Sequence, residues 1–190
     1  MKPHYLTTPI YYVNDKPHIG HAYTTLACDV LARFKRLDGY SVKFLTGTDE
    51  HGQKVQAAAE KAGVSPQEFT DTVSQNFRDL LVVMNFSNDQ FIRTTEPRHY
   101  KSCQAIWKRL MDKGFITLDK YEGWYSVRDE AFFTETELVD GKAPTGAPVS
   151  WVEEPSYFFN LSEWQQPLLD YYEANPNFIA PEAKRKEVIS

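Results

Sequence analysis

Apolar positions in the first part of the chain follow two spacings, one typical of strands and one typical of helices. Short apolar or β-branched runs at 4–10, 41–46 and 90–93 predict three strands, the first of them buried and the second closed by Gly47. The segment after Ala22 predicts a helix that ends before Gly39, because apolar residues recur there every three or four positions: Leu26, Val30, Phe34 and Leu37.

Three further helices follow from local start and stop signals. Residues 53–62 are alanine-rich and stop at Gly63, and Ser65-Pro66-Gln67-Glu68 has the form of a capping box that opens a helix to about residue 84. Another helix runs from about residue 96 to just before Gly114. Strands and helices in this order predict an α/β fold with a parallel sheet and right-handed crossovers.

The pattern changes after Gly114. Aromatic residues gather between 115 and 172, and the alternation at 115–118 and 121–127 predicts antiparallel hairpins. Turns are predicted at Asp140-Gly141 and Thr145-Gly146, and a helix after Ser162. Residues 115 to about 175 are therefore interpreted as a mainly β, aromatic-rich insertion with its own core.

Composition narrows the class of protein. The 190 residues carry 21 Lys and Arg against 26 Asp and Glu, and 42% are hydrophobic, which excludes disorder and rod-like folds. With a net charge of −5, the chain lacks the excess of positive charge that is typical of a stand-alone nucleic-acid-binding protein. Cys28 and Cys103 form no disulfide framework, and the chain shows no signal peptide or membrane-spanning run, so a reduced, cytoplasmic protein is expected.

The segment from Pro9 to His21 predicts a phosphate site. A strand there leads through a turn into a helix, which leaves backbone N–H groups and the positive end of a helix dipole in one crevice. His18 and His21 flank Gly20, so that two imidazoles can donate to phosphate oxygens while the glycine lets a base or ribose approach. The alternatives are a solvated helix start or a partial metal site, for which no third ligand stands nearby.

The segment 47–52 places two carboxylates and a histidine after the second strand. Ligands of open α/β sheets bind at the carboxyl ends of strands, so Asp49, Glu50 and His51 could hold an ammonium group or act in acid–base chemistry. The alternative is that Asp49 merely caps the following helix.

These residues carry a family resemblance. Pro17-His18-Ile19-Gly20-His21 resembles the HIGH signature of class I aminoacyl-tRNA synthetases, and residues 7–14 together with 46–52 are similar to the methionyl-tRNA synthetases among them. The resemblance implies the first half of a Rossmann catalytic domain at 1–114, a connective peptide at 115–175 and the start of the return at 176–190. Other enzymes with an H-x-G-H motif, in other class I synthetases or nucleotidyltransferases, remain the alternative.

The resemblance also implies the reaction and its residues. Methionine is activated by ATP, accompanied by Mg²⁺, and the methionyl group passes to tRNA(Met), which is bound mainly through regions beyond Ser190. Ile10 and Tyr12 correspond to walls of the methionine pocket, and Asp49 corresponds to the carboxylate that binds the α-ammonium. The ATP-binding signature corresponds to His18, Gly20 and His21, of which the two histidines are the catalytic residues.

Two departures from the family pattern matter. The positions of a zinc knuckle hold Ser126, Asp129, Ala143 and Gly146, so no structural zinc is expected, and an aromatic core is expected to hold the knuckle instead: Trp124, Tyr125, Phe132, Phe133 and Trp151. The KMSKS loop does not occur within these residues, so the chain is expected to be largely inactive alone, or to be a non-catalytic binding module. Lys184-Arg185-Lys186 is interpreted as a solvated helix face rather than a tRNA patch.

Overall fold

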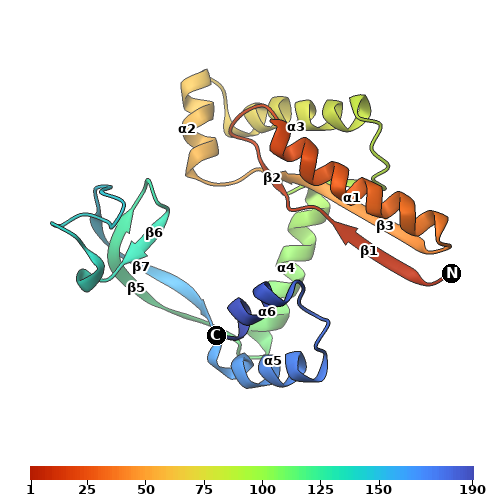
Figure 1. The fold of residues 1–190 in the computed structure, drawn as a ribbon. Coiled ribbons are helices and arrows are strands. Elements are labelled where there is room, and N and C mark those ends of the chain that lie inside the picture. Colours follow the sequence, from red (N-terminus) through yellow and green to blue (C-terminus); the bar gives the residue numbers. More distant parts are fainter. The chain divides into compact units, whose positions relative to one another are not determined.

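The computed structural model describes residues 1–190, which divide into two compact units, Met1–Gln104 and Ala105–Ser190 (Figure 1). The first is α/β with a parallel sheet, and the second is built around an antiparallel sheet with helices. The predicted fold class is confirmed. The finer boundaries at residues 114 and 175 stay predictions. No helix is long and apolar enough to cross a membrane.

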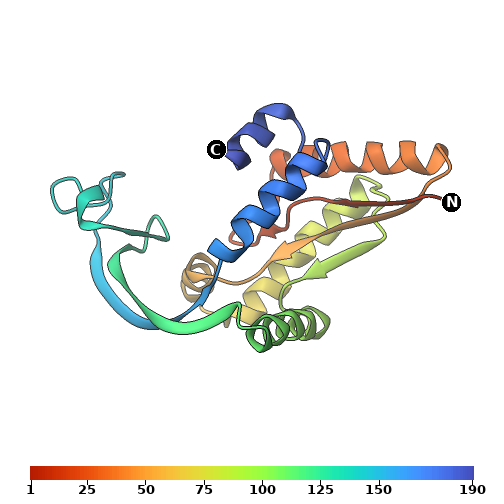
Figure 2. The same cartoon turned by 90° about the horizontal axis from the view of Figure 1, so that it is seen from below.

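The first unit contains a parallel sheet whose central strand is β3. In chain order its elements are β1 (Pro3–Thr7), β2 (Tyr11–Tyr12), α1 (Ile19–Leu37), β3 (Ser41–Asp49), α2 (Gln53–Ala62), α3 (Pro66–Val83), β4 (Gln90–Arg93) and the first part of α4 (Pro97–Asp112). Leu45 pairs with both β1 and β4, and Thr48 pairs with both β2 and β4, so β1 and β2 share one edge of β3. Figure 2 shows β1, β3 and β4 side by side with α1 along them.

Two strands differ from the sequence prediction. β1 ends at Thr7 rather than residue 10, because Pro9 has no N–H to donate to the ladder, and its residues are exposed or half-buried rather than buried. β3 continues through Gly47 to Asp49. A Cβ at Gly47 would lie 2.1 Å from the Ile92 carbonyl oxygen, so this glycine permits the close approach of β4 instead of ending the strand.

Helix α1 packs through an unexpected face. It ends at Leu37 as predicted, with Gly39 at φ 81°, but it begins already at Ile19. Its buried residues are Thr25, Asp29 and Ala32, whereas the predicted apolar stripe is exposed, from 43% at Leu26 to 89% at Leu37. Compact side chains on the packed face let the helix lie close to β3.

Two small hydrophobic clusters form the core of the first unit. The first consists of Tyr11, Val13, Val55, Val73 and Phe77, and joins β2 to α2 and α3. The second consists of Ala32, Val42 and Phe44, between α1 and β3. The predicted helix signals hold, since Gly63 ends α2 at φ 72° and the Ser65 hydroxyl accepts a hydrogen bond from the Glu68 N–H at 3.2 Å.

The second unit contains a long two-stranded ribbon. After the end of α4 come β5 (Ile116–Ser126), β6 (Ala131–Phe133), a 3₁₀ turn η1 (Glu135–Glu137), β7 (Ser150–Phe159), α5 (Ser162–Ala174) and α6 (Glu182–Ile189). β5 pairs antiparallel with β6 and, from Ile116–Phe159 to Tyr125–Ser150, with β7 (Figure 2). The two alternating runs expected from the sequence are thus one continuous strand.

Aromatic contacts do lie at the far end of this ribbon. Phe132 contacts the rings of Tyr121 and Tyr125 at centroid distances of 4.3 and 4.8 Å, and Trp124 meets Trp151 at 5.5 Å. Trp151 is nevertheless 52% exposed. These rings therefore form a surface cluster rather than a closed core.

Candidate functional site

The predicted site residues converge at the carboxyl end of the sheet. β2, β3 and β4 all end there, and α1, α2 and α4 follow them. Tyr12 is the register partner of Asp49, which places two predicted pocket residues side by side. Ile10 precedes β2, is 44% exposed and belongs to neither core cluster.

His18 and His21 cap helix α1 reciprocally. The Gly20 N–H donates to His18 Nδ1 at 3.1 Å, and the His18 N–H donates to His21 Nδ1 at 3.0 Å. The rings stack with centroids 3.8 Å apart. These backbone N–H groups are therefore not free for phosphate, contrary to the sequence-based expectation.

This capping fixes the tautomer of both rings. An Nδ1 atom that accepts a hydrogen bond carries no proton, so each neutral imidazole carries its proton on Nε2. Burial, with the neighbouring His18 ring, lowers the pKa of His21 below its ordinary value. His21 is further supported by the rings of Tyr11 and Phe77, at 4.8 and 5.1 Å. The pair thus presents two Nε2–H donors.

Gly20 has a structural reason to be glycine. A Cβ there would lie 2.9 Å from the His18 ring carbon Cε1, so a larger residue would disturb the cap. The predicted approach of a base or ribose at this position stays a prediction.

Asp49 is the uncommitted carboxylate of the segment 47–52. Its side chain makes no hydrogen bond or ion pair within the chain, and the N-cap of α2 is Gly52, which rules out the capping alternative. Gly52 has φ 112°, and a Cβ there would lie 2.4 Å from the Tyr12 hydroxyl oxygen. The turn thus brings Tyr12 and Asp49 together at one place.

Glu50 plays a different part from Asp49. Its side chain is fully buried and forms an ion pair with Arg93, with Oε1 2.7 Å from Arg93 Nε. It is therefore unavailable to a ligand.

His51 is exposed beside the same turn. The Thr94 hydroxyl oxygen lies 2.9 Å from the Glu50 N–H, which donates to it, and 3.0 Å from His51 Nδ1. Tyr100 OH lies 3.4 Å from His51 Nε2. Thr94 thus joins the ends of β3 and β4.

The supporting residues Tyr11, Phe77, Arg93 and Thr94 were not singled out from the sequence. The position of Arg93 and Thr94 directly after the third predicted strand is a signal that could have indicated them, because the carboxyl ends of parallel strands meet at one edge.

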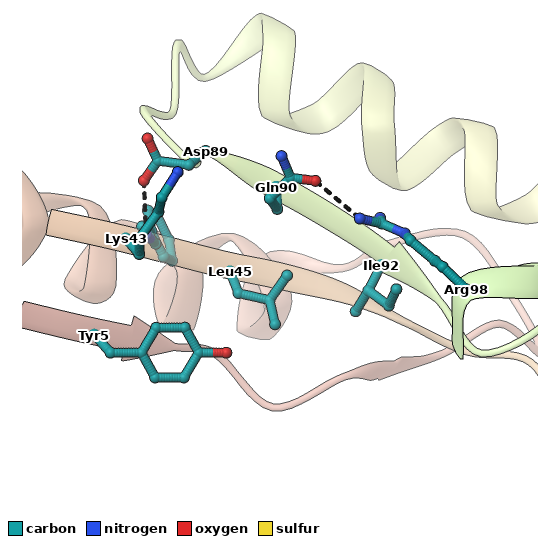
Figure 3. A pocket seen from close by; sticks show the side chains of 8 residues that line it. Tyr5, Lys43, Leu45, Asp89, Gln90, Ile92 and Arg98 are labelled. Carbon is teal, nitrogen blue, oxygen red and sulfur yellow. Dashed lines mark hydrogen bonds between the residues drawn. The ribbon is translucent and has the colours of Figure 1, made fainter. Parts of the chain in front are cut away.

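One cavity of the first unit lies away from the predicted site residues. Its volume is about 310 Å³, and the side chains of Tyr5, Lys43, Leu45, Gln90 and Ile92 line it together with Arg98 (Figure 3). Val42 and Phe44 face α1, and successive strand residues alternate, so Lys43 and Leu45 face away from α1. None of the predicted site residues lines this cavity.

No metal site is evident. The chain contains no cluster of three or more His, Cys, Asp or Glu side chains that could hold a metal ion. At the positions of the family's zinc ligands, Ala143 and Gly146 offer no ligand atom, so the residues present do not fit zinc.

Hydrogen bonds join the two loops at these positions instead. Asp129 Oδ2 accepts from the hydroxyls of Ser126, at 2.8 Å, and Thr145, at 2.7 Å. The bonds from Thr145 and Ser126 lower the pKa of Asp129. Ser126 and Ala143 are themselves buried.

Comparison with known proteins shows the family to which this chain belongs. The family model described as tRNA synthetases class I (M) matches residues 4–150, and the chain belongs to this family. It is 64% identical over 188 residues to the methionine–tRNA ligase of Rickettsia conorii and 57% identical over 192 residues to that of Mesorhizobium japonicum. In each case 98% of this chain and 37% of the relative are covered, so the chain spans little more than a third of their length.

Solved structures of the same family also match this chain. The structure of Mycobacterium tuberculosis methionyl-tRNA synthetase in complex with methionyl-adenylate matches all of this chain, and 38% of its own, with a TM-score of 0.90 and 53% identity. The apo form of that enzyme matches with a TM-score of 0.74 and 48% identity.

Proposed function

We propose that this chain supplies the methionine pocket and half of the ATP site of a methionine–tRNA ligase. The observation that carries the proposal is the uncommitted carboxylate of Asp49, paired in register with Tyr12 at the carboxyl end of the sheet, while the His18–His21 cap begins the helix that follows β2. In this proposal residues 1–114 are the first Rossmann half, 115–175 the connective peptide and 176–190 the start of the return, in a cytoplasmic enzyme.

The proposed chemistry assigns a role to each group. The Asp49 carboxylate binds the α-ammonium of methionine, and Ile10 and Tyr12 flank the thioether side chain. A methionine carboxylate oxygen then attacks the α-phosphorus of ATP in line, forming the acyl–phosphate bond as the bond to pyrophosphate breaks. His18 and His21 donate from Nε2–H to phosphate oxygens, where negative charge grows in the transition state. Mg²⁺ arrives with ATP as part of the substrate.

Transfer to tRNA(Met) follows in the longer protein. A ribose hydroxyl of the tRNA attacks the methionyl carbonyl carbon, and AMP leaves. The acidic balance of this chain, −5, agrees with tRNA being held mainly by regions beyond Ser190.

ATP–pyrophosphate exchange by the full-length protein tests the proposal. With a panel of amino acids, we expect exchange with methionine and little with cysteine or leucine. Strong exchange with another amino acid, and none with methionine, would favour a different synthetase. For the 190-residue chain alone we expect little or no aminoacylation, and robust turnover would contradict this.

Two substitutions test the assigned roles in the same assay. Asp49→Ala should mainly raise the methionine KM, because the ammonium loses its counter-charge. His21→Ala should mainly lower kcat, by about 10²- to 10³-fold, as expected for a lost charge-stabilising donor. An unchanged methionine KM in Asp49→Ala removes that residue from its role.

The knuckle at 126–146 is proposed to be held without zinc. Its two loops are joined by the Asp129 carboxylate and the hydroxyls of Ser126 and Thr145. Metal analysis of purified protein should give less than stoichiometric zinc, and one zinc per chain would overturn this.

A further inference from the structure

Glu50 lies between two exposed or half-buried neighbours and is itself completely enclosed. Its carboxylate accepts four hydrogen bonds: from Thr48 Oγ1 at 2.7 Å, Arg93 Nε at 2.7 Å, Arg93 Nη2 at 2.9 Å and Thr95 Oγ1 at 2.6 Å. A carboxylate has about four lone-pair sites, so all of its acceptor capacity is used. Glu50 cannot also bind a ligand.

These bonds tie three elements together at the point where the chain leaves the sheet. Thr48 lies at the end of β3 and Glu50 directly after it, while Arg93 ends β4 and Thr95 follows two residues later. Arg93 also pairs with Asp71 of α3, and its bonds to both carboxylates raise its pKa. The Glu50 N–H donates to Thr94, so both the backbone and the side chain of Glu50 are fixed.

A buried ion pair of this kind is a poor way to gain stability alone. Burying two charges costs about as much as their attraction returns, and apolar residues of similar volume often serve as well. The pair does fix geometry, because the planar guanidinium meets the carboxylate at two points. The adjacent Asp49 side chain makes no hydrogen bond or ion pair that would hold it in place.

We infer that Glu50 and Arg93 form a positioning pair, which fixes the turn 49–52 so that Asp49 is held ready for the α-ammonium of the amino-acid substrate. The inference rests on the proposed function for the identity of the ligand. What it states about the protein itself is that the Glu50–Arg93 pair keeps the turn 49–52 in one conformation. Neither residue touches the substrate, and both act through Asp49.

The test uses Glu50→Gln in the full-length protein, with Thr95→Val as a milder variant in case Glu50→Gln fails to fold. We expect the methionine KM to rise about 10- to 100-fold, the range for a small misplacement of a binding group. The KM for ATP should change less than about twofold. Binding of 4-(methylsulfanyl)butanoate, which is methionine without its α-amino group, should be unchanged, because this analogue has no ammonium for Asp49.

Asp29→Asn is the matched control. Asp29 is another buried carboxylate held by an arginine and a hydroxyl, but it contacts the loop that leads into β4. This variant should lower stability and leave the methionine KM unchanged. Equal losses for methionine, its analogue and ATP in Glu50→Gln would show a merely structural role and overturn the inference.

Amide hydrogen exchange separates this inference from the proposed function. In Glu50→Gln or Thr95→Val the amides of 49–52 should exchange faster than in the unsubstituted protein, whether or not the protein activates methionine. Unchanged exchange of this turn overturns the inference. Absence of methionine-dependent activity in the unsubstituted protein overturns the proposed function instead.

Discussion

Two buried carboxylates, Asp29 and Glu50, lie toward opposite ends of the sheet. Both are held by an arginine and hydroxyl groups, but they have different structural roles. Asp29 on α1 accepts bonds from the Ser87 N–H and hydroxyl, both at 2.6 Å, and from Arg33 at 2.7 Å. Glu50 at the carboxyl end is bonded by an arginine and two hydroxyls. The Asp29 cluster fastens a helix to a loop, whereas the Glu50 cluster fixes a turn that carries an uncommitted carboxylate. A buried ion pair therefore does not by itself indicate a ligand site. It does so here only because an uncommitted carboxylate, Asp49, lies next to it.

The largest effect that separates the two clusters should come from their arginines. Arg93→Ala leaves the fully buried Glu50 carboxylate without its cation, which should lower the free energy of unfolding by about 3–5 kcal/mol. Arg33 is 47% exposed, and Asp29 keeps both Ser87 bonds, so Arg33→Ala should cost less than about 1 kcal/mol. Urea unfolding of the full-length protein, followed by circular dichroism, measures both. Equal losses in the free energy of unfolding for Arg93→Ala and Arg33→Ala would contradict the difference between the two clusters.

A smaller difference should separate two glycines. At Gly47 an added Cβ meets the backbone of Ile92, so Gly47→Ala should push β4 away and cost at least about 1–3 kcal/mol. At Gly39, before β3, nothing lies within 4 Å, and the cost is the positive φ alone, about 1 kcal/mol. Hydrogen exchange of β3 and β4 amides would detect the first change and not the second. Protection of β4 that survives Gly47→Ala would contradict the close approach.

The smallest effect concerns pH at Asp29. Burial raises the pKa of this carboxyl, but the bonds from Ser87 and Arg33 outweigh burial and lower the pKa below its ordinary value. The unfolded chain therefore binds the proton more readily, so Asp29 stabilises the fold above about pH 4, and this contribution is lost as pH falls further. The stability difference between the unsubstituted protein and Asp29→Asn should shrink between pH 6 and pH 3. A difference that stays constant over this range would contradict the shift.

Local signals in the sequence were sufficient for most elements. Gly63 and the Ser65 cap set adjoining ends of α2 and α3, since both act within one helical turn. The packed face of α1 was not predictable, because it depends on Asp29 meeting Ser87, 58 residues away. The extent of β3 was misjudged at Gly47, whose role depends on Ile92 of another strand.

The candidate site shows the same division. His18, Gly20 and His21 form one local motif, and Asp49 follows a strand, so their type and spacing were informative. Arg93 could not be paired with Glu50 from the sequence, because 43 positions separate them and ion pairing leaves no local pattern. The state of the two histidines was also out of reach, since it depends on which atoms the backbone N–H groups meet.

The hydrogen bonds at Nδ1 of the two histidines also bear on how salt would affect the proposed phosphate contact. Because His18 and His21 each accept a backbone hydrogen bond at Nδ1, any bond that their Nε2–H donates lies in series with it, and hydrogen bonds in series polarise one another. In the proposed role, such an N–H donor would attract phosphate at short range through its local dipole, which mobile ions screen little, whereas a lysine at the same place would act as a full charge. The proposed hydrogen bonds from these two rings to phosphate should therefore depend little on ionic strength.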